Sequence, residues 1–146
     1  MSRRIAVILA PLIVAACGRA HTPSAADSAA TAKQLDDSII ALRTQQAPAI
    51  ADSARSILKV LLTHPETAVF DSVVVVQPPE QDGNWPLPYV CGRIGGKPGI
   101  GGKNVMTPFI YQNRLTVFVL DQSNGPAFAA LRAKACANPA SRVLLR

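Results

Sequence analysis

The segment CGRIGGKPGIGGKN, residues 91–104, has residue types that can hold a phosphate group, because glycine-rich loops bring backbone N–H groups close to an anion. The P-loop pattern GxxxxGK[ST] also requires a hydroxyl that holds Mg²⁺. Here Lys103 follows Gly102, but Lys97 occupies the position of the first glycine and Asn104 that of the hydroxyl. The next segment is strand-like, so no helix begins there. The segment therefore predicts turns with glycines at positive φ, not a nucleotide site.

Acid–base or nucleophilic catalysis would have to use His64 or a pair of carboxylates. His64 stands beside Pro65 at a predicted helix end, which favours a capping or surface role. No GxSxG nucleophile elbow occurs. The carboxylates that could cleave a glycan lie in no recognisable context; they are Asp71, Glu80, Asp82 and Asp121. The sequence thus indicates no catalytic residue, metal-ligand set or cofactor, and it favours a non-enzymatic protein over an enzyme with an unrecognised site.

The N-terminus has the features of a bacterial export signal. Two arginines precede an apolar run, residues 5–14, that is too short to remain as a membrane-spanning helix. The run ends in VAAC, residues 14–17, which resembles the lipobox of bacterial lipoproteins. This resemblance implies that residues 1–16 are a signal peptide and that Cys17 becomes the acylated first residue. The alternatives are an ordinary secretory signal with a coincidental Cys, or an uncleaved anchor.

The residue after Cys17 indicates in which membrane a lipoprotein is anchored. Several acyl chains, such as palmitate, on one residue are enough for stable attachment. Under the sorting rule known for enterobacterial lipoproteins, Asp at position 18 would favour retention in the inner membrane, whereas this chain has Gly18. We therefore expect an outer-membrane anchor facing the periplasm, with inner-membrane anchoring as the alternative.

The two remaining cysteines, Cys91 and Cys136, would then lie in an oxidising compartment, where a pair of thiols most simply forms a disulfide. Closing a loop of about 45 residues corresponds to about 4 kcal/mol in the chain-entropy description. A metal pair or a nucleophilic thiol is the alternative, but the sequence has no CxxC motif and no Cys/His cluster to support either.

Charge is distributed unevenly along the chain. Residues 17–82 carry five basic and eight acidic side chains, whereas residues 83–146 carry eight basic side chains and one acidic side chain, Asp121. The basic second half either complements the first half or contacts an acidic partner. In the periplasm such partners are anionic lipid headgroups, lipopolysaccharide phosphates or an acidic envelope protein. Without interleaved aromatic and basic residues, the pattern does not predict nucleic-acid binding.

The elements that must position these residues begin after a polar segment. Residues 17–32 are small and polar, which predicts a flexible tether, and residues 33–146 form one domain. Leu35, Ile39 and Leu42 have helical spacing, and Pro48 is expected to end or kink this helix near Gln46. A second apolar pattern, residues 50–62, predicts the main core-facing helix.

Four strands are expected over residues 67–77, 89–94, 107–111 and 114–120, the last two joined as a tight hairpin. A closing helix follows from Pro126 to Cys136. The predicted fold is α+β: N-terminal helices, a four-stranded antiparallel meander, and a C-terminal helix that the disulfide pins to the second strand.

The candidate binding residues lie in or beside two predicted loops, residues 78–88 and 95–104. Trp85, in the first loop, is either a small core plug or an exposed contact. Arg93, Lys97 and Lys103 are the basic side chains in or beside the second loop.

Residues 60–137 also resemble a family of small uncharacterised bacterial and phage proteins with a CGxVNAKNxxGG-like motif. The matching positions are Leu62, Pro65, Ala68, Phe70, Cys91, Gly92, Lys97, Gly101, Gly102, Pro108 and Phe109. Two asparagines that would have formed the most evident polar site of the family are replaced here by Gly95 and Pro98. The family has no assigned activity, so the resemblance implies the fold and the disulfide but no reaction.

These observations favour a membrane-anchored binding or envelope-interaction module. An inhibitor of a hydrolase is the alternative, since small disulfide-closed lipoproteins suit that role. An enzyme with an unrecognised site is the third hypothesis.

Overall fold

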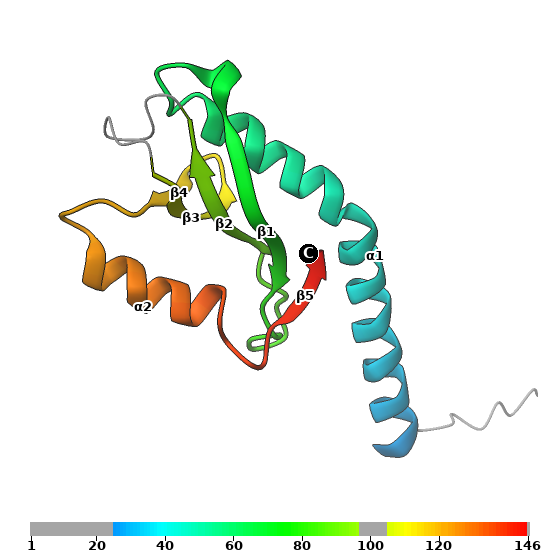
Figure 1. The fold of residues 1–146 in the computed structure, drawn as a ribbon. Helices are drawn as coiled ribbons and strands as arrows, with labels where there is room; N and C mark the ends of the chain where they lie inside the picture. The colour runs from blue at the N-terminus through cyan, green and yellow to red at the C-terminus, as the bar shows by residue number, and fades with distance from the viewer. Residues whose placement is uncertain (1–24, 97–104, 146) are drawn as a thin grey trace, which may run out of the picture.

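The computed structural model describes residues 25–96 and 105–145, which form an α+β fold with an antiparallel sheet (Figure 1). The elements in chain order are α1 (Ala25–Lys59), the short 3₁₀ helix η1 (Pro65–Thr67), β1 (Val69–Gln77), β2 (Tyr89–Gly95), β3 (Thr107–Asn113), β4 (Thr116–Val119), α2 (Gly125–Ala135) and β5 (Arg142–Leu145). The predicted fold class is therefore confirmed.

The sheet has the strand order β4-β3-β2-β1-β5. The four strands of the predicted meander pair in sequence, but a fifth strand, β5, adds itself beside β1, with Val143 opposite Val76. The sequence analysis did not anticipate β5 because four residues at a chain end, with no alternation of polar and apolar side chains, give no strand signal of their own.

The two helices cover opposite faces of the sheet (Figure 1). Alternating strand residues divide between them, since successive side chains point to opposite faces. Val90 and Ile94 join the core beneath α1, whereas Ile110 joins a second, smaller core beneath α2. The sheet is thus the middle layer of three.

α1 is one continuous helix of 35 residues, so the expected end of the helix near Gln46 is wrong. Pro48 lies inside the helix but is exposed, so its ring and the carbonyl that it leaves without a partner face water. Ala47, Ala51 and Ala54 are fully buried on the neighbouring side of the helix, which faces the sheet. Burial of these small side chains against the sheet on both sides of the proline turn outweighs the lost hydrogen bond.

The same helix begins at Ala25, eight residues before the position where the sequence predicted helical structure. Five of residues 25–32 are alanine, the best helix former, which favours a helix over the expected tether in this part. The first buried residue of α1 is Ala47, so residues 25–46 extend beyond the sheet. Among the described residues, no helix combines the length and apolarity needed to cross a membrane.

Close packing explains why one position of the glycine-rich segment, Gly92, is a glycine. It lies opposite Phe109 in the β2–β3 register, and a Cβ at Gly92 would lie 2.9 Å from the Phe109 ring and 3.2 Å from the backbone of Val73. Phe109 is 1% exposed and packs edge-on against Phe70. Glycine is required here by close approach. The expected positive φ is wrong for Gly92 and for its described neighbours Gly95 and Gly96, and the other glycines of the segment lie outside the described residues.

We expect Gly92→Ala to lower the free energy of unfolding by about 1–3 kcal/mol, because the methyl group overpacks the contact with Phe109. Urea denaturation measures this change. Gly125→Ala is the matched control, since a Cβ there meets nothing within 4 Å, and it should not destabilise the protein. Equal stability of the two variants would contradict the close packing over β2.

Candidate functional site

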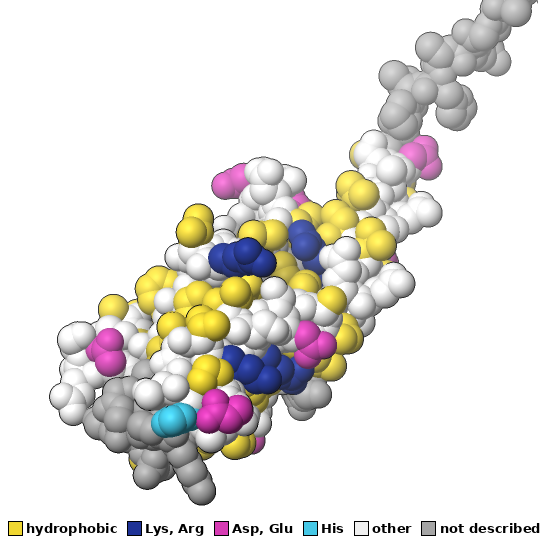
Figure 2. Space-filling model, turned by 90° about the horizontal axis from the view of Figure 1, so that it is seen from above, with side chains coloured by type: hydrophobic (Ala, Val, Ile, Leu, Met, Phe, Trp, Pro, Cys, Tyr) yellow, Lys and Arg dark blue, Asp and Glu magenta, His cyan; other side chains and the backbone are white. Residues whose placement is uncertain are grey.

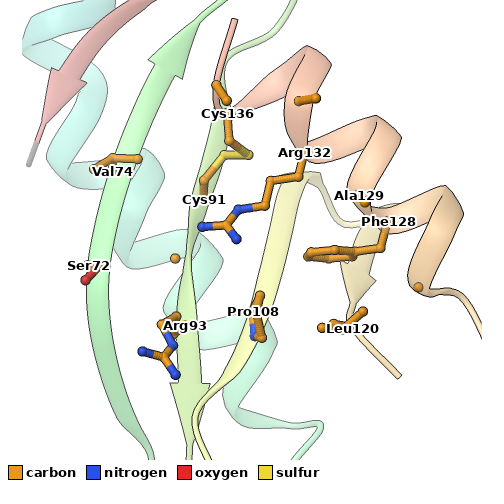
Figure 3. Close-up of a pocket in the computed structure, with 14 residues that line it drawn as sticks. Ser72, Val74, Cys91, Arg93, Pro108, Leu120, Phe128, Ala129, Arg132 and Cys136 are labelled. Atoms are coloured by element: carbon orange, nitrogen blue, oxygen red, sulfur yellow. A yellow bond between two sulfur atoms is a disulfide. The ribbon is translucent and has the colours of Figure 1, made fainter. Parts of the chain in front are cut away.

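A groove of about 610 Å³ opens between α2 and the sheet face formed by β1, β2 and β3 (Figure 3). Its lining residues are Ser72, Val74, Cys91, Gly92, Arg93, Pro108, Leu120, Gly125, Phe128, Ala129, Arg132, Ala133, Cys136 and Ala137. A cavity of this size can hold a small molecule. It is a candidate binding site in the described part of the chain.

The disulfide between Cys91 and Cys136, which the sequence predicted, forms one end of the groove. It joins β2 to the C-cap of α2. Phe128, one turn into α2 from its start, is buried against Ile110 and so holds the other end of the helix on the sheet. The helix is therefore fixed at both ends.

The middle of α2 leaves space because its inner residues are small. Phe128, Arg132 and Cys136 follow one another at intervals of four, so one face of the helix points toward the sheet. Ala129 and Ala133 lie on the same face and are exposed in the groove. Larger side chains at these two positions would fill the cavity, so the alanines keep it open.

A β-bulge in β1 shapes the opposite wall. The register of β1 against β2 shifts between Asp71 and Val74, and Ser72 adopts a φ of 52° within the bulge. A left-handed φ is strained for a residue with a side chain, and bulges redirect side chains next to functional sites. Ser72 lines the groove, and its hydroxyl has no hydrogen-bond partner among the described residues. It can therefore bond a ligand.

Two arginines enter the groove from different elements. Figure 3 shows Arg132 reaching from α2 toward Cys91 on β2, and Arg93 on β2 further from the disulfide. Arg93 donates one hydrogen bond of 3.4 Å to the carbonyl of Met106. Neither guanidinium belongs to an ion pair in the described part of the chain, where the ion pairs are Arg55–Asp52 and His64–Glu66. Each arginine thus retains donors that can bind a carboxylate or phosphate in bidentate fashion.

Asp71 is the carboxylate placed closest to this pair by the strand register, directly opposite Arg93. It is exposed and does not line the groove, and the described residues show no ion pair between Asp71 and Arg93. The groove therefore keeps a net positive lining.

Asp121 instead organises the loop that begins α2. Its carboxylate accepts hydrogen bonds from the Ser123 hydroxyl and backbone N–H, both at 2.7 Å, and from the Asn124 N–H at 2.9 Å. The bonds from Ser123, followed by the one from Asn124, lower the pKa of Asp121 below its ordinary value. Asn124 also donates to the carbonyl of Val119 at 2.8 Å. This network fixes the start of α2 relative to β4 and hence the width of the groove.

Of the binding residues predicted from the sequence, one lies in the groove of the described structure. Arg93 lines the groove, whereas Trp85 is half-buried in the loop before β2 and does not line it. Gln77 secures that loop by donating to the carbonyls of Pro78 and Pro86. The remaining predicted sites, Cys17, Lys97 and Lys103, lie outside the described residues.

Arg132 was missed by the sequence analysis, although a signal for it was present. It lies four residues before Cys136, so any helix ending in the predicted disulfide must turn Arg132 toward the same strand. His64 is exposed, 3.2 Å from Glu66 on η1, and does not line the groove, as its predicted surface role requires.

The groove combines cationic and apolar lining groups. The described lining residues include two guanidinium groups and one hydroxyl, and they include no histidine and no carboxylate. In the described ranges, His, Cys, Asp and Glu form no group of three able to hold a metal ion. Pro108, Leu120 and Phe128 provide an apolar wall at the end away from the disulfide. The arrangement can bind an anionic group beside an apolar one.

No family model, no curated protein and no solved structure matches this chain. The groove is therefore interpreted from its own residues, geometry and charge.

We expect replacement of both cysteines, Cys91→Ser with Cys136→Ser, to lower the free energy of unfolding by up to about 4 kcal/mol, because the unfolded chain regains the entropy of the open loop. Urea denaturation with and without a thiol reductant measures the loss. The reductant should destabilise the wild type toward the value of the double variant and leave the variant itself unchanged. If the reductant does not change the free energy of unfolding of the wild type, the structural role of the disulfide is contradicted.

Proposed function

We propose that this chain is a membrane-anchored binding lipoprotein of the periplasm that holds an anionic amphiphile in the groove beneath α2. The observation that carries the proposal is that Arg93, on a strand, and Arg132, on a helix, both line one groove whose described lining has no carboxylate. Both arginines are exposed and can form charge-assisted hydrogen bonds to an anion in the groove, which are stronger than bonds between neutral groups.

The lining of the groove offers polar and apolar groups for the two parts of such a ligand. The guanidinium groups favour a carboxylate or phosphate, and the Ser72 hydroxyl adds a further donor. Phe128, Pro108 and Leu120 favour an acyl or aryl segment next to it. A short lipid fragment, or a fatty acid with its carboxylate, combines both parts.

The charge of the whole second half of the chain supports an anionic partner. Residues 83–146 carry eight basic side chains against Asp121, and Asp121 is engaged in its own loop. A positive field of this extent concentrates anions near the groove and makes binding sensitive to ionic strength.

The membrane anchor in this proposal is Cys17, the last residue of VAAC. α1 begins eight residues after it, and the first buried residue of α1 is Ala47. At about 1.5 Å per helical residue, residues 25–46 are about 33 Å long. The absence of Asp at position 18 favours the outer membrane as the location of the anchor.

A binding test compares three probes that share one chain length: decanoate, decyl phosphate and decanol. We expect the two anions to bind and decanol to bind at least tenfold more weakly, because charge-assisted hydrogen bonds contribute about 1.5–3 kcal/mol each. Arg132→Ala should weaken decanoate binding by about tenfold or more in isothermal titration calorimetry.

Arg142→Ala is the matched control, since Arg142 is exposed on β5 and does not line the groove. Equal binding of decanol and decanoate, or equal losses in the Arg132 and Arg142 variants, would show that the groove does not select an anion.

The anchor is tested separately by metabolic labelling with radiolabelled palmitate. We expect the wild type to incorporate label and to sediment with outer membranes, and the Cys17→Ala variant to do neither, because the acylated sulfur is gone. Cys136→Ala is the control and should still be labelled. Label in Cys17→Ala at the wild-type level would refute the lipobox interpretation.

A further inference from the structure

α1 carries an apolar stripe that the described residues leave uncovered. Leu35 and Leu42 are 61% and 57% exposed, and Ile39 between them is half-buried. None of the three belongs to either core cluster. Figure 2 shows hydrophobic side chains on the part of the molecule that extends toward the N-terminal segment. Exposed large apolar side chains with helical spacing indicate a contact with another helix.

The stripe continues along most of α1 with the spacing of a coiled coil. Its positions, at alternating intervals of four and three, are Ser28, Ala32, Leu35, Ile39, Leu42, Gln46, Ala49 and Ser53. The three large apolar residues lie in the middle, and the ends are small. The stripe spans nearly four heptads, which is long enough for a paired helix.

The stripe and the core-facing side of α1 do not coincide. At about 100° per residue, the stripe lies about 120° around the helix from Ala47, Ala51 and Ala54, which pack on the sheet. Ala49 and Ser53 are exposed although they lie on the part of α1 that covers the sheet. A second helix can therefore follow the stripe over its full length without displacing the sheet.

We propose that the stripe is covered by α1 of a second copy of this chain, in antiparallel orientation. In this register Ile39 packs beside Leu42 of the second copy, and Leu42 beside Ile39 of that copy. Leu35 meets Gln46 of the other copy, whose methylene groups can cover it, and Ala32 meets Ala49 and Ser28 meets Ser53 at the two ends. The contact is the same for both copies, as a two-fold dimer requires.

Charge complementarity selects the second copy and the antiparallel orientation. In the stripe's heptad, Asp36 and Arg43 follow Leu35 and Leu42 and flank the apolar middle on one side. In the antiparallel register, Asp36 of each copy lies beside Arg43 of the other, giving two reciprocal ion pairs. Neither residue has an ion pair within the described part of its own chain. A parallel pair would instead place Ser38 beside Arg43 and Thr31 beside Asp36, without any ion pair.

This inference is independent of the ligand proposed for the groove, because α1 and α2 lie on opposite faces of the sheet (Figure 1). It is tested by charge exchange in the full chain, measured by sedimentation equilibrium in detergent. We expect the wild type to dimerise, and Asp36→Arg and Arg43→Asp each to weaken dimerisation by about tenfold, because each variant places two pairs of like charges together.

The mixture of the two variants is the decisive measurement. When Asp36→Arg chains are mixed with Arg43→Asp chains, both flanking pairs again join opposite charges, so a mixed dimer should form with the wild-type affinity. Circular dichroism of each variant alone checks that both remain folded. Substitution of the stripe, Leu42→Ser, should abolish dimerisation, whereas Leu115→Ser, at a 97% exposed turn residue, should leave it unchanged.

Two outcomes would overturn the proposal. If the wild type stays monomeric at every concentration, a second copy does not cover the stripe. This holds also if an N-terminal segment of the same chain protects the stripe. A dimer whose affinity the charge variants do not change, or that the mixture fails to restore, excludes the antiparallel register.

Discussion

The disulfide between Cys91 and Cys136 is the constraint on which the second half of the molecule depends. Cys91 lies in β2, the middle strand of the sheet, and Cys136 caps α2, so one covalent bond sets where the helix can lie. α2 has few large apolar side chains, and its buried residues are Phe128 and Ala135. Without the disulfide, so small a contact would hold the helix weakly. With it, the helix can present Ala129 and Ala133 to an open groove and still remain in place.

The same bond determines how the chain ends. After Cys136 the chain has only a short connection before β5 pairs with β1 at Val76 and Gln77. Leu144 and Leu145 then pack against the core beneath α1. The chain therefore leaves α2 on one face of the sheet, and Leu144 and Leu145 contact the core on the other face.

The sequence predicted the features that depend on local chemistry and missed those that depend on tertiary contact. The strand patterns predict the meander, and Pro126 predicts the start of the closing helix. The number of cysteines left after Cys17 predicts the Cys91–Cys136 pair. The continuity of α1 could not be predicted from Pro48 alone, because it depends on alanines buried against strands that come later in the chain. The role of Gly92 depends likewise on the ring of Phe109 on the neighbouring strand, and the groove depends on α2 and β2 each contributing an arginine to its lining.

The two proposed contacts can operate together because they use opposite faces of the sheet. An antiparallel pair of α1 helices would leave α2 and its groove uncovered in both copies, so the dimer would carry two arginine-lined grooves. Where both grooves face the same side of the dimer, a surface that displays many anionic groups, as a membrane does, would engage the two grooves at once. The second contact would then form at the high effective concentration set by the first. Dimerisation would thus strengthen binding to an anionic surface without any change in the groove itself.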